Sequence, residues 1–465
     1  MISRRLVGRA NFAGRLSCAR DSATFRPPRL SLRTKIVRFP RDTRGASATI
    51  FALVLPVLIG FECLGALTGI SYMVKRRTQF AADAAAISGA YEIIAGTTDI
   101  GGQITAAAME AAQQNGYQGA IPTITYPYSD SRLENGIAVT LQQSLASTFL
   151  PDVTMVAKAV AVVEPLDNPC LLALAGNGTG VEVNDFVSLQ LSACSLAANS
   201  TSSVAIDIHP SVRSVTADTL LTPGEISFNG GPLGPTAPPP EFVLTLPLMI
   251  GSPEVKNPYA QTLTHAFLSG SIPGSPEPAN TWVAVTETIN SGLYDGGMSI
   301  GSEAVIDLTP GAYYVTNGNF SIASGATVTC KTCDSISGVT IILTTGSAVT
   351  GVVGTAMISS GATVTLQAPR GGPFSGFLLL QDPLAISAGG DKPDNALYGG
   401  PTMNLTGLLY FPTTTVAFQG NPQATCTVLI AQQITIDGDS RLTISGCAMV
   451  GLTGIPTVYT PVLVE

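Results

Sequence analysis

The chain has 465 residues, 45% of them hydrophobic, so it is long enough for two or three folded units with real cores. Only 12% of its residues are charged, and it holds 48 Gly and 32 Pro, a composition that favours a turn-rich extracellular β protein over a cytosolic enzyme. The net charge is −8, and residues after Arg77 hold 8 of the 23 basic and 28 of the 31 acidic residues, a net charge of −20, which excludes nucleic acid and anionic bilayers as electrostatic partners of that part.

Residues 1–44 form a basic leader. They contain twelve Lys and Arg against two acids, Asp21 and Asp42, and little apolar pattern, so we expect a disordered cytoplasmic tail. A secretory signal peptide is the competing interpretation. The apolar run that follows is longer than the usual signal h-region and lacks an obvious small-residue cleavage site, which favours a segment that stays attached.

Residues 45–77 are the predicted transmembrane anchor. From Ala46 to Val74 the sequence reads ASATIFALVLPVLIGFECLGALTGISYMV and holds one side chain of the Asp, Glu, Lys and Arg types, Glu62. As a helix this segment crosses a hydrocarbon core of about 30 Å. The basic excess before it predicts a cytoplasmic N-terminus, with everything after Arg77 outside the cytoplasm of a bacterial inner membrane.

Glu62, Gly65 and Gly69 are the candidate membrane-helix contacts. A carboxylate near the middle of a bilayer costs about 2.5–3.5 kcal/mol unless it is protonated, paired or near an interface. Gly65 and Gly69 form a GxxxG step, which lets another helix approach closely, either from a different membrane protein or from a second copy of this chain. The alternative is that this spacing has no partner, because glycine is common in membrane helices.

Residues 78–166 are expected to form a helical stalk and a small α+β module. The membrane helix should continue into TQFAADAAAISGAYEIIAG, which has apolar residues at helical spacing: Phe80, Ala84, Ile87 and Tyr91. A second helix is predicted over Gln103–Gln114, ending at Asn115 and Gly116. Alternation predicts three strands: Pro122–Tyr126, Gly136–Leu141 and Val153–Val163.

Residues 41–92 carry an ordered set of motifs: RGASATIFALVLPVLIGF, then basic residues, then TQFAADAAAISGA. This set resembles the N-terminal region of TadG-like proteins of the tight-adherence (Flp) pilus assembly system. Their pattern is Arg-Gly before an apolar FALVLP run, then basic residues and a Q/N-x-AADAAA helix. Related TadE-like pseudopilins carry Glu five residues after a cleaved Gly. Here Ile50 holds that place after Gly45, which favours a permanent anchor over processing into the fibre.

Residues 167–465 contain a recurrent eleven-residue phrase. It has two apolar residues in alternation, a small or polar turn, and two or three more apolar residues: VEVNDFVSLQL from Val181, MSIGSEAVIDL from Met298, FSIASGATVTC from Phe320, AMISSGATVTL from Ala356 and ITIDGDSRLTI from Ile434. Each phrase predicts a strand, a tight corner and a strand. Since Met298 and Phe320 stand 22 residues apart, about one coil, we predict an extracytoplasmic right-handed parallel β-helix-like solenoid.

A β-sandwich is the alternative fold, because its short strands and glycine turns give similar patterns. Two proline-rich connectors, residues 232–240 and 273–278, interrupt the region. We therefore expect an insertion over about 230–280 that separates early coils from late ones.

The exported part holds six cysteines, an even number that is typical of disulfides in an oxidising compartment: Cys170, Cys194, Cys330, Cys333, Cys426 and Cys447. We expect them to pair as sequence neighbours, although six cysteines permit 15 connectivities. Cys330 and Cys333 could instead form half a metal clamp or a redox dithiol. A zinc site would need a second such pair or histidines, and His209 and His265 lie far away in sequence.

The sequence shows no recognisable active site, and we expect neither catalysis nor a cofactor or metal. Four acids of the phrases fall at corners or outward strand positions, where solvent exposure explains them: Glu303, Asp307, Asp437 and Asp439. The two histidines offer no triad with a serine, and no phosphate-binding GxxxxGK[ST] loop occurs.

Together these features predict a membrane-anchored structural or accessory component of tight-adherence pilus assembly. Its partners would be the inner membrane and other pilus-assembly membrane proteins, with self-association through the membrane helix as a further possibility. The alternative function is an anchored carbohydrate-binding or polysaccharide-cleaving β-helix protein.

Overall fold

The computed structural model describes residues 46–129, 136–145, 152–234, 239–346, 353–390, 392–423 and 425–464. The chain divides into two compact units, residues 1–69 and 70–465. The predicted tail over 1–44 lies outside the described residues.

Helix α1 runs without interruption from Ala46 to Ile94 and continues through Pro56. Over Ile50–Ile94 its most apolar window has a mean hydropathy of 2.3, so the helix is long and apolar enough to cross a membrane. The three basic residues 75–77 lie inside it. The prediction that the apolar helix continues into the stalk is therefore confirmed.

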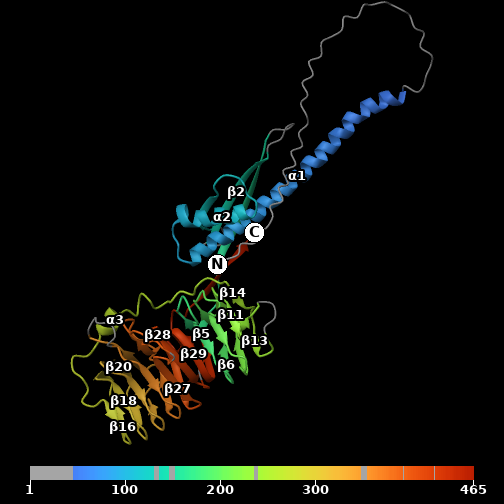
Figure 1. Cartoon of the computed structure of the whole chain (residues 1–465). Coiled ribbons are helices and arrows are strands. Elements are labelled where there is room, and N and C mark those ends of the chain that lie inside the picture. The colour runs from blue at the N-terminus through green and yellow to red at the C-terminus, as the bar shows by residue number, and fades with distance from the viewer. Residues whose placement is uncertain are drawn as a thin grey trace, which may run out of the picture. The chain divides into compact units, whose positions relative to one another are not determined.

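The second unit begins with a small α+β module. A π-helix, η2 (Ile100–Ile104), leads into helix α2 (Thr105–Gln114), and Asn115 caps α2 before Gly116, whose φ is +85°. The predicted helix end is thus confirmed. An antiparallel sheet has the order β1-β2-β3-β30 and consists of β1 (Thr123–Tyr128), β2 (Gly136–Leu145), β3 (Val153–Asp167) and β30 (Val458–Val464). Figure 1 shows α2 beside β2. The last strand, from the far end of the chain, was not predicted.

Alanines form the face of α1 that packs in the module core. The buried residues are Ala81, Ala82, Ala85, Ala86 and Ala90, and they belong to one hydrophobic cluster with α2, β2 and β3. The four apolar residues at helical spacing lie outside this face: Phe80 is 53% and Tyr91 is 43% exposed, and Ala84 and Ile87 are half-buried. Small side chains let the helix come close to the sheet: a Cβ added at Gly89 would lie 2.7 Å from Ile137 Cδ1.

A second hydrophobic core lies among the strands that follow. In chain order its elements are β4 (Pro169–Ala173), β5 (Val181–Val183), β6 (Ser188–Ser192), β7 (Ser195–Ala198), β8 (Ile206–Ile208), β9 (Ser214–Ala217), β10 (Leu220–Thr222), β11 (Ile226–Phe228), β12 (Gly231–Pro232), β13 (Phe242–Leu244), β14 (Met249–Ile250), α3 (His265–Ser269), β15 (Thr281–Trp282), β16 (Thr286–Ile289), β17 (Gly292–Asp295), β18 (Met298–Ile300), β19 (Val305–Leu308), β20 (Gly311–Thr316), β21 (Phe320–Ile322), β22 (Thr327–Thr329), β23 (Val339–Leu343), β24 (Ala356–Ile358), β25 (Thr363–Gln367), β26 (Phe377–Gln381), β27 (Asn395–Gly400), β28 (Met403–Gly420), β29 (Thr427–Thr443) and the 3₁₀ turn η3 (Cys447–Val450). The chain is therefore mainly β, as predicted.

Four of the five phrases fold as predicted, into two strands joined by a corner. The fifth, from Ile434, lies within the continuous strand β29, whose successive parts pair with β5 and β6. The sixth residue of four phrases has a left-handed backbone: Phe186, Glu303, Gly325 and Gly361, with φ between +62° and +83°. Left-handed φ is unfavourable for residues other than Gly. The phrase therefore recurs because the corner needs the same backbone at the same place.

Replacing Gly325 with Ala should destabilise the fold by about 1–2 kcal/mol, because its φ is +78°. The added Cβ would meet nothing closer than Glu303 N at 4.0 Å, so the loss would report backbone strain alone. Glu303→Gly, at φ +62°, should stabilise the protein by about 0.5–1 kcal/mol. Thermal unfolding of both variants, with Gly346→Ala as a control in open space, measures this; unchanged stability for Gly325→Ala would contradict it.

The strands of this region pair in parallel with the strand three places along the chain. For example, β18 pairs with β21, β21 with β24 and β24 with β27, and Met298 lies opposite Phe320. The second and third strands of each repeat pair in the same way, as in β19 with β22 and β20 with β23. Among the described strands β4–β29, the antiparallel pair is β11 with β12. Repeats of three strands therefore stack on one another.

The stack does not follow chain order. Strand β29 pairs with β28 and also with β4, β5 and β6, which come from the start of the region. Figure 1 shows β5 and β6 near β28 and β29. The chain leaves the stack after Thr443, and β4 pairs with Leu429–Ala431, where a following strand would otherwise lie. Residues 281–443 thus continue in space into residues 169–250.

Two disulfides flank this junction. Cys170 of β4 is bonded to Cys194, next to β7, and Cys426, next to β29, is bonded to Cys447 of η3, where the chain leaves. The third joins Cys330 to Cys333 at a corner, with a Cα–Cα distance of 5.3 Å. The pairing of sequence neighbours is confirmed. Loops of 24 and 21 residues suggest about 3 kcal/mol from each junction disulfide by loop entropy.

One row of strands is hydrophobic on both faces, in contrast to the alternating burial of the others. Strands β4, β23 and β26 are buried along nearly their whole length, with the sequences PCLLA, VTIIL and FLLLQ. Continuous apolar runs are typical of parallel strands covered on both sides. Residues 251–280, which we call the strap, provide apolar side chains to this core: Val255, Tyr259, Leu263 and Leu268.

The strap contacts strands from successive repeats. Asn199 exchanges two hydrogen bonds with the backbone of Val255, at 2.8 and 2.9 Å, and the Tyr259 ring packs edge-on against Phe377 and Tyr410. Near its end the Glu277 N–H donates to the Leu293 carbonyl at 2.7 Å. The expected insertion over 230–280 therefore includes an ordered segment that joins β14 to β15, at opposite ends of the stack.

Candidate functional site

The three membrane-helix candidates lie on α1 at positions i, i+3 and i+7, which places Glu62, Gly65 and Gly69 on one face of the helix. Glu62 is exposed. A Cβ at Gly65 or Gly69 would meet no described atom within 4 Å. The structure thus leaves this face open.

The four acids singled out in the phrases lie at or near corners: Glu303, Asp307, Asp437 and Asp439. Asp307 accepts a hydrogen bond from Lys331 N at 2.7 Å, and Asp439 accepts one from Ser188 N at 2.8 Å. Asp439 also accepts from Arg213 Nη1 at 3.3 Å. Glu303 is itself a left-handed corner residue. For Asp307 and Asp439 the structure therefore adds a structural role to simple solvent exposure, because each carboxylate binds the next repeat.

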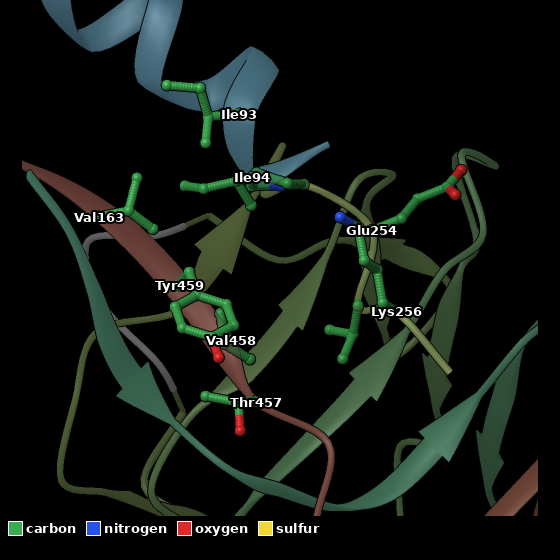
Figure 2. A pocket seen from close by; sticks show the side chains of 10 residues that line it. Ile93, Ile94, Val163, Glu254, Lys256, Thr457, Val458 and Tyr459 are labelled. Carbon is green, nitrogen blue, oxygen red and sulfur yellow. The ribbon is translucent and has the colours of Figure 1, made fainter. Parts of the chain in front are cut away.

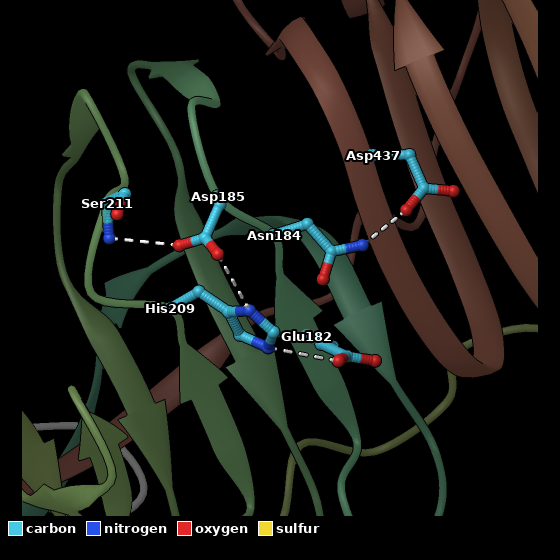
Figure 3. Close-up of polar contacts among 6 residues, drawn as sticks. All are labelled: Glu182, Asn184, Asp185, His209, Ser211 and Asp437. Atoms are coloured by element: carbon cyan, nitrogen blue, oxygen red, sulfur yellow. Dashed lines mark hydrogen bonds and ion pairs between the residues drawn. The ribbon is translucent and has the colours of Figure 1, made fainter.

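A polar cluster crosses the junction between β29 and β5. His209 Nε2 lies 3.2 Å from Glu182 Oε1 and its Nδ1 lies 3.8 Å from Asp185 Oδ2. Figure 3 shows His209 between these two carboxylates, and Asn184 turned toward Asp437. The pairing of β5 with β8 brings His209 to Glu182 and Asp185, and the junction of β29 with β5 adds the contact between Asn184 and Asp437.

A cleft of about 480 Å³ opens beside this cluster, and we call it the polar cleft. Its lining includes residues from β5, β27, β28, β29 and the segment before β27: Glu182, Lys392, Tyr398, Ala417, Thr435 and Asp437. Ala417 pairs in register with Thr435, and Thr435 with Glu182. Tyr398 Oη donates to Asp437 at 2.6 Å. Burial, then this hydrogen bond and the charge of Asp437, raise the pKa of Tyr398, so it remains a donor.

Asp394 fixes one rim of the polar cleft. Its carboxylate accepts hydrogen bonds from Thr415 N at 3.0 Å, Thr415 Oγ1 at 2.9 Å and Ala388 N at 2.7 Å. Burial acts to raise the pKa of Asp394, but the hydrogen bonds outweigh it and hold the pKa below its ordinary value. The ionised form is therefore the one that the folded rim binds.

Because the folded pKa of Asp394 is lowered, its contribution to stability is full above the unfolded pKa of about 4 and is lost as the pH falls through the folded pKa. Asp394→Asn should lower the melting temperature at pH 7. Below pH 4 the melting temperatures of the variant and the wild type should become more similar. Melting curves from pH 2 to 7 test this. Parallel curves for the two proteins would contradict it.

The described residues contain no group of three His, Cys, Asp or Glu side chains that could hold a metal ion. Cys330 and Cys333 are joined to each other, so in this structure they are neither free thiols nor a metal clamp. The polar cleft instead offers hydroxyl, carboxylate and ammonium groups above a floor of small side chains. This arrangement is suited to holding a polar ligand by hydrogen bonds.

A second hollow, of about 230 Å³, is mainly apolar. Figure 2 shows Ile93, Ile94 and Val163 with Val458 and Tyr459 around it, and Lys256 and Glu254 at one side. The chain passes from the module into the parallel strands after β3 and returns to the module in β30. Residues of β3, of β30 with the residue before it, and of the strap line this hollow together.

Sequence reasoning missed the polar cleft. It predicted the phrases that begin at Val181 and Ile434 and expected an insertion between early and late coils, but not that these two phrases pair as neighbours. One feature of the sequence could have indicated the cleft. The second residue of each phrase points outward, and it is Glu182 in one of these phrases and Thr435 in the other.

Comparisons with protein-family models, with curated proteins and with solved structures gave no match. The resemblance over residues 41–92 therefore stands on its sequence motifs.

Proposed function

We propose that this chain is a membrane-anchored, non-catalytic structural component of tight-adherence pilus assembly, held in a bacterial inner membrane by one helix. The observation that carries the proposal is the sequence of 41–92, in which an Arg-Gly, an FALVLP run, basic residues and an AADAAA helix occur in the TadG-like order. The continuity of α1 through this region supports a single anchor that passes directly into a folded module.

Charge supports the proposed orientation. Twelve basic residues precede the apolar segment and three follow it, so the N-terminus should remain cytoplasmic and the strands should lie outside the cytoplasm. Three disulfides among the described residues are in keeping with an oxidising compartment.

The body would be a right-handed parallel β-helix-like solenoid that acts as an envelope scaffold or an adhesion-related surface. Parallel pairing of strands three apart supports this class over an antiparallel sandwich. In a stack of this kind neighbouring repeats supply most of the contacts.

Glu62→Leu should weaken recovery of other membrane components of the pilus system with this protein, because it removes the polar group on the open helix face. Co-purification from detergent-solubilised membranes measures the effect. Leu64→Ala, on the opposite side of α1, is the matched control and should recover as much as wild type. Equal recovery with Glu62→Leu would remove this contact from the proposal.

A further inference from the structure

The face that carries the polar cleft has an unusually small-residue floor. The middle positions of successive first strands pair in register from one end of the stack to the other, in the order Thr281, Ser299, Ser321, Met357, Ala396, Ala417, Thr435, Glu182, Asp207 and Ser227. At the cleft this row is Ala417, which is fully buried, and Thr435, which is half-buried, so Thr435 is the residue of the row that an extended ligand can reach there. Neighbouring strands lie about 4.8 Å apart, comparable to one sugar ring of a polysaccharide.

The walls combine an aromatic ring with groups that donate and accept hydrogen bonds. Tyr398 is partly buried and its hydroxyl is held by Asp437, which fixes the ring at the edge of the cleft. Glu182 lies across the cleft floor from Tyr398, and its carboxylate also contacts the His209 ring. A sugar ring has an apolar C–H face and a hydroxyl edge, which match a fixed aromatic ring and polar side chains respectively.

The charges around the polar cleft limit which polysaccharides it can bind. Glu182, Asp437 and, one strand further along the row, Asp207 face this side, against Lys392 and His209. An acidic polymer would meet net repulsion there, whereas hydroxyl or amine groups would find acceptors.

We propose that the polar cleft binds a polysaccharide of uncharged or amine-bearing sugars. The chain lies across Thr435, one ring packs against Tyr398, and the Glu182 carboxylate accepts from a hydroxyl or amine. The site depends on the junction between residues 169–250 and 281–443, because Glu182 and Tyr398 come from its two sides.

The test is biolayer interferometry on the full-length protein in nanodiscs, at 150 mM salt, roughly physiological ionic strength. The probes are hydroxyethyl cellulose, which is uncharged, glycol chitosan, which carries amines, and alginate, which carries carboxylates. We expect saturable binding of at least one of the first two, and binding of alginate at least about tenfold weaker.

Cleft variants separate this site from general attraction to an acidic protein. Tyr398→Ala and Glu182→Gln should each weaken binding about tenfold, while Tyr398→Phe, which keeps the ring, should lose less. Tyr91→Ala and Glu287→Gln, exposed residues outside the cleft, are the matched controls and should bind as wild type. If Tyr398→Ala fails to fold, Glu182→Gln and Tyr398→Phe decide the question.

Three results would overturn the proposal. They are absence of binding to both non-acidic polymers, alginate binding as tight as theirs, and non-acidic binding that the cleft variants leave unchanged. The pilus proposal would survive each of them, because it is tested through the membrane helix.

Discussion

Deleting residues 46–69 should move the protein completely from the membrane fraction to the soluble fraction. This segment is the most apolar part of α1, and each buried CH₂ contributes about 0.8 kcal/mol to partition into lipid. The remaining part of α1 keeps its alanine face in the module core, so the deleted protein should still fold. Membranes washed with alkaline carbonate, followed by centrifugation and immunoblotting, measure the distribution.

Full-length protein in the carbonate supernatant would contradict membrane anchoring. The Glu62→Leu variant is the matched control for this experiment, because it changes the same helix but keeps its length and should remain in the pellet.

Replacing His265 with Ala should destabilise the body by about 2–4 kcal/mol, one of the largest losses expected for a single substitution in the strap. His265 Nδ1 lies 2.7 Å from Asp382 Oδ2, and the Asp382 side chain is fully buried. Thr344 Oγ1 donates to the same oxygen at 2.6 Å, and Leu384 N donates to the other oxygen at 2.9 Å. Removing the histidine takes one hydrogen-bond partner from a fully buried carboxylate.

Thermal unfolding of the full-length protein in detergent measures this loss, which should lower the melting temperature by about 5–10 °C. His209→Ala is the matched control. Its pairs with Glu182 and Asp185 are about one-third exposed, so the loss should be about 1 kcal/mol or less. Equal melting temperatures for wild type and His265→Ala would show that the strap is not held by this pair.

Helix ends, corners, the membrane helix and the disulfides could be predicted from the sequence, because in each case a residue type or a length has a known physical effect. The end of α2 at Asn115 and Gly116 was predicted because few residues other than glycine tolerate the left-handed turn that closes a helix. The phrase corners were predicted for the same reason, since Gly325 and Gly361 mark them. Apolar length predicted α1, and cysteine spacing predicted the disulfides.

Burial within α1 was harder to predict. The helical spacing of Phe80 and Tyr91 predicted a helix but not its packed face, because the sheet requires close approach and Ala81 and Ala85 allow it. The small size of the alanine side chains determined which face of α1 packs against the sheet. Hydrophobicity alone did not indicate this face, because close packing depends on side-chain volume as well.

Long-range order could not be predicted from one sequence. The phrases at Val181 and Ile434 are equivalent in pattern, and nothing in either one states which repeat it stacks on. The junction also explains why β30 was missed: the chain leaves the stack beside its point of entry, so a strand at the end of the sequence completes the sheet next to β3. The polar cleft lies at this junction, and its residues could be found only once the stacking order was known.

Pilus assembly is tested most directly by deleting the gene, restoring it, and counting surface pili by electron microscopy together with attachment of cells to a surface. The account predicts that deletion abolishes or sharply reduces pili and attachment, and that the full chain restores both while the chain lacking residues 46–69 restores neither. Unchanged pili and attachment in the deletion strain would contradict the account.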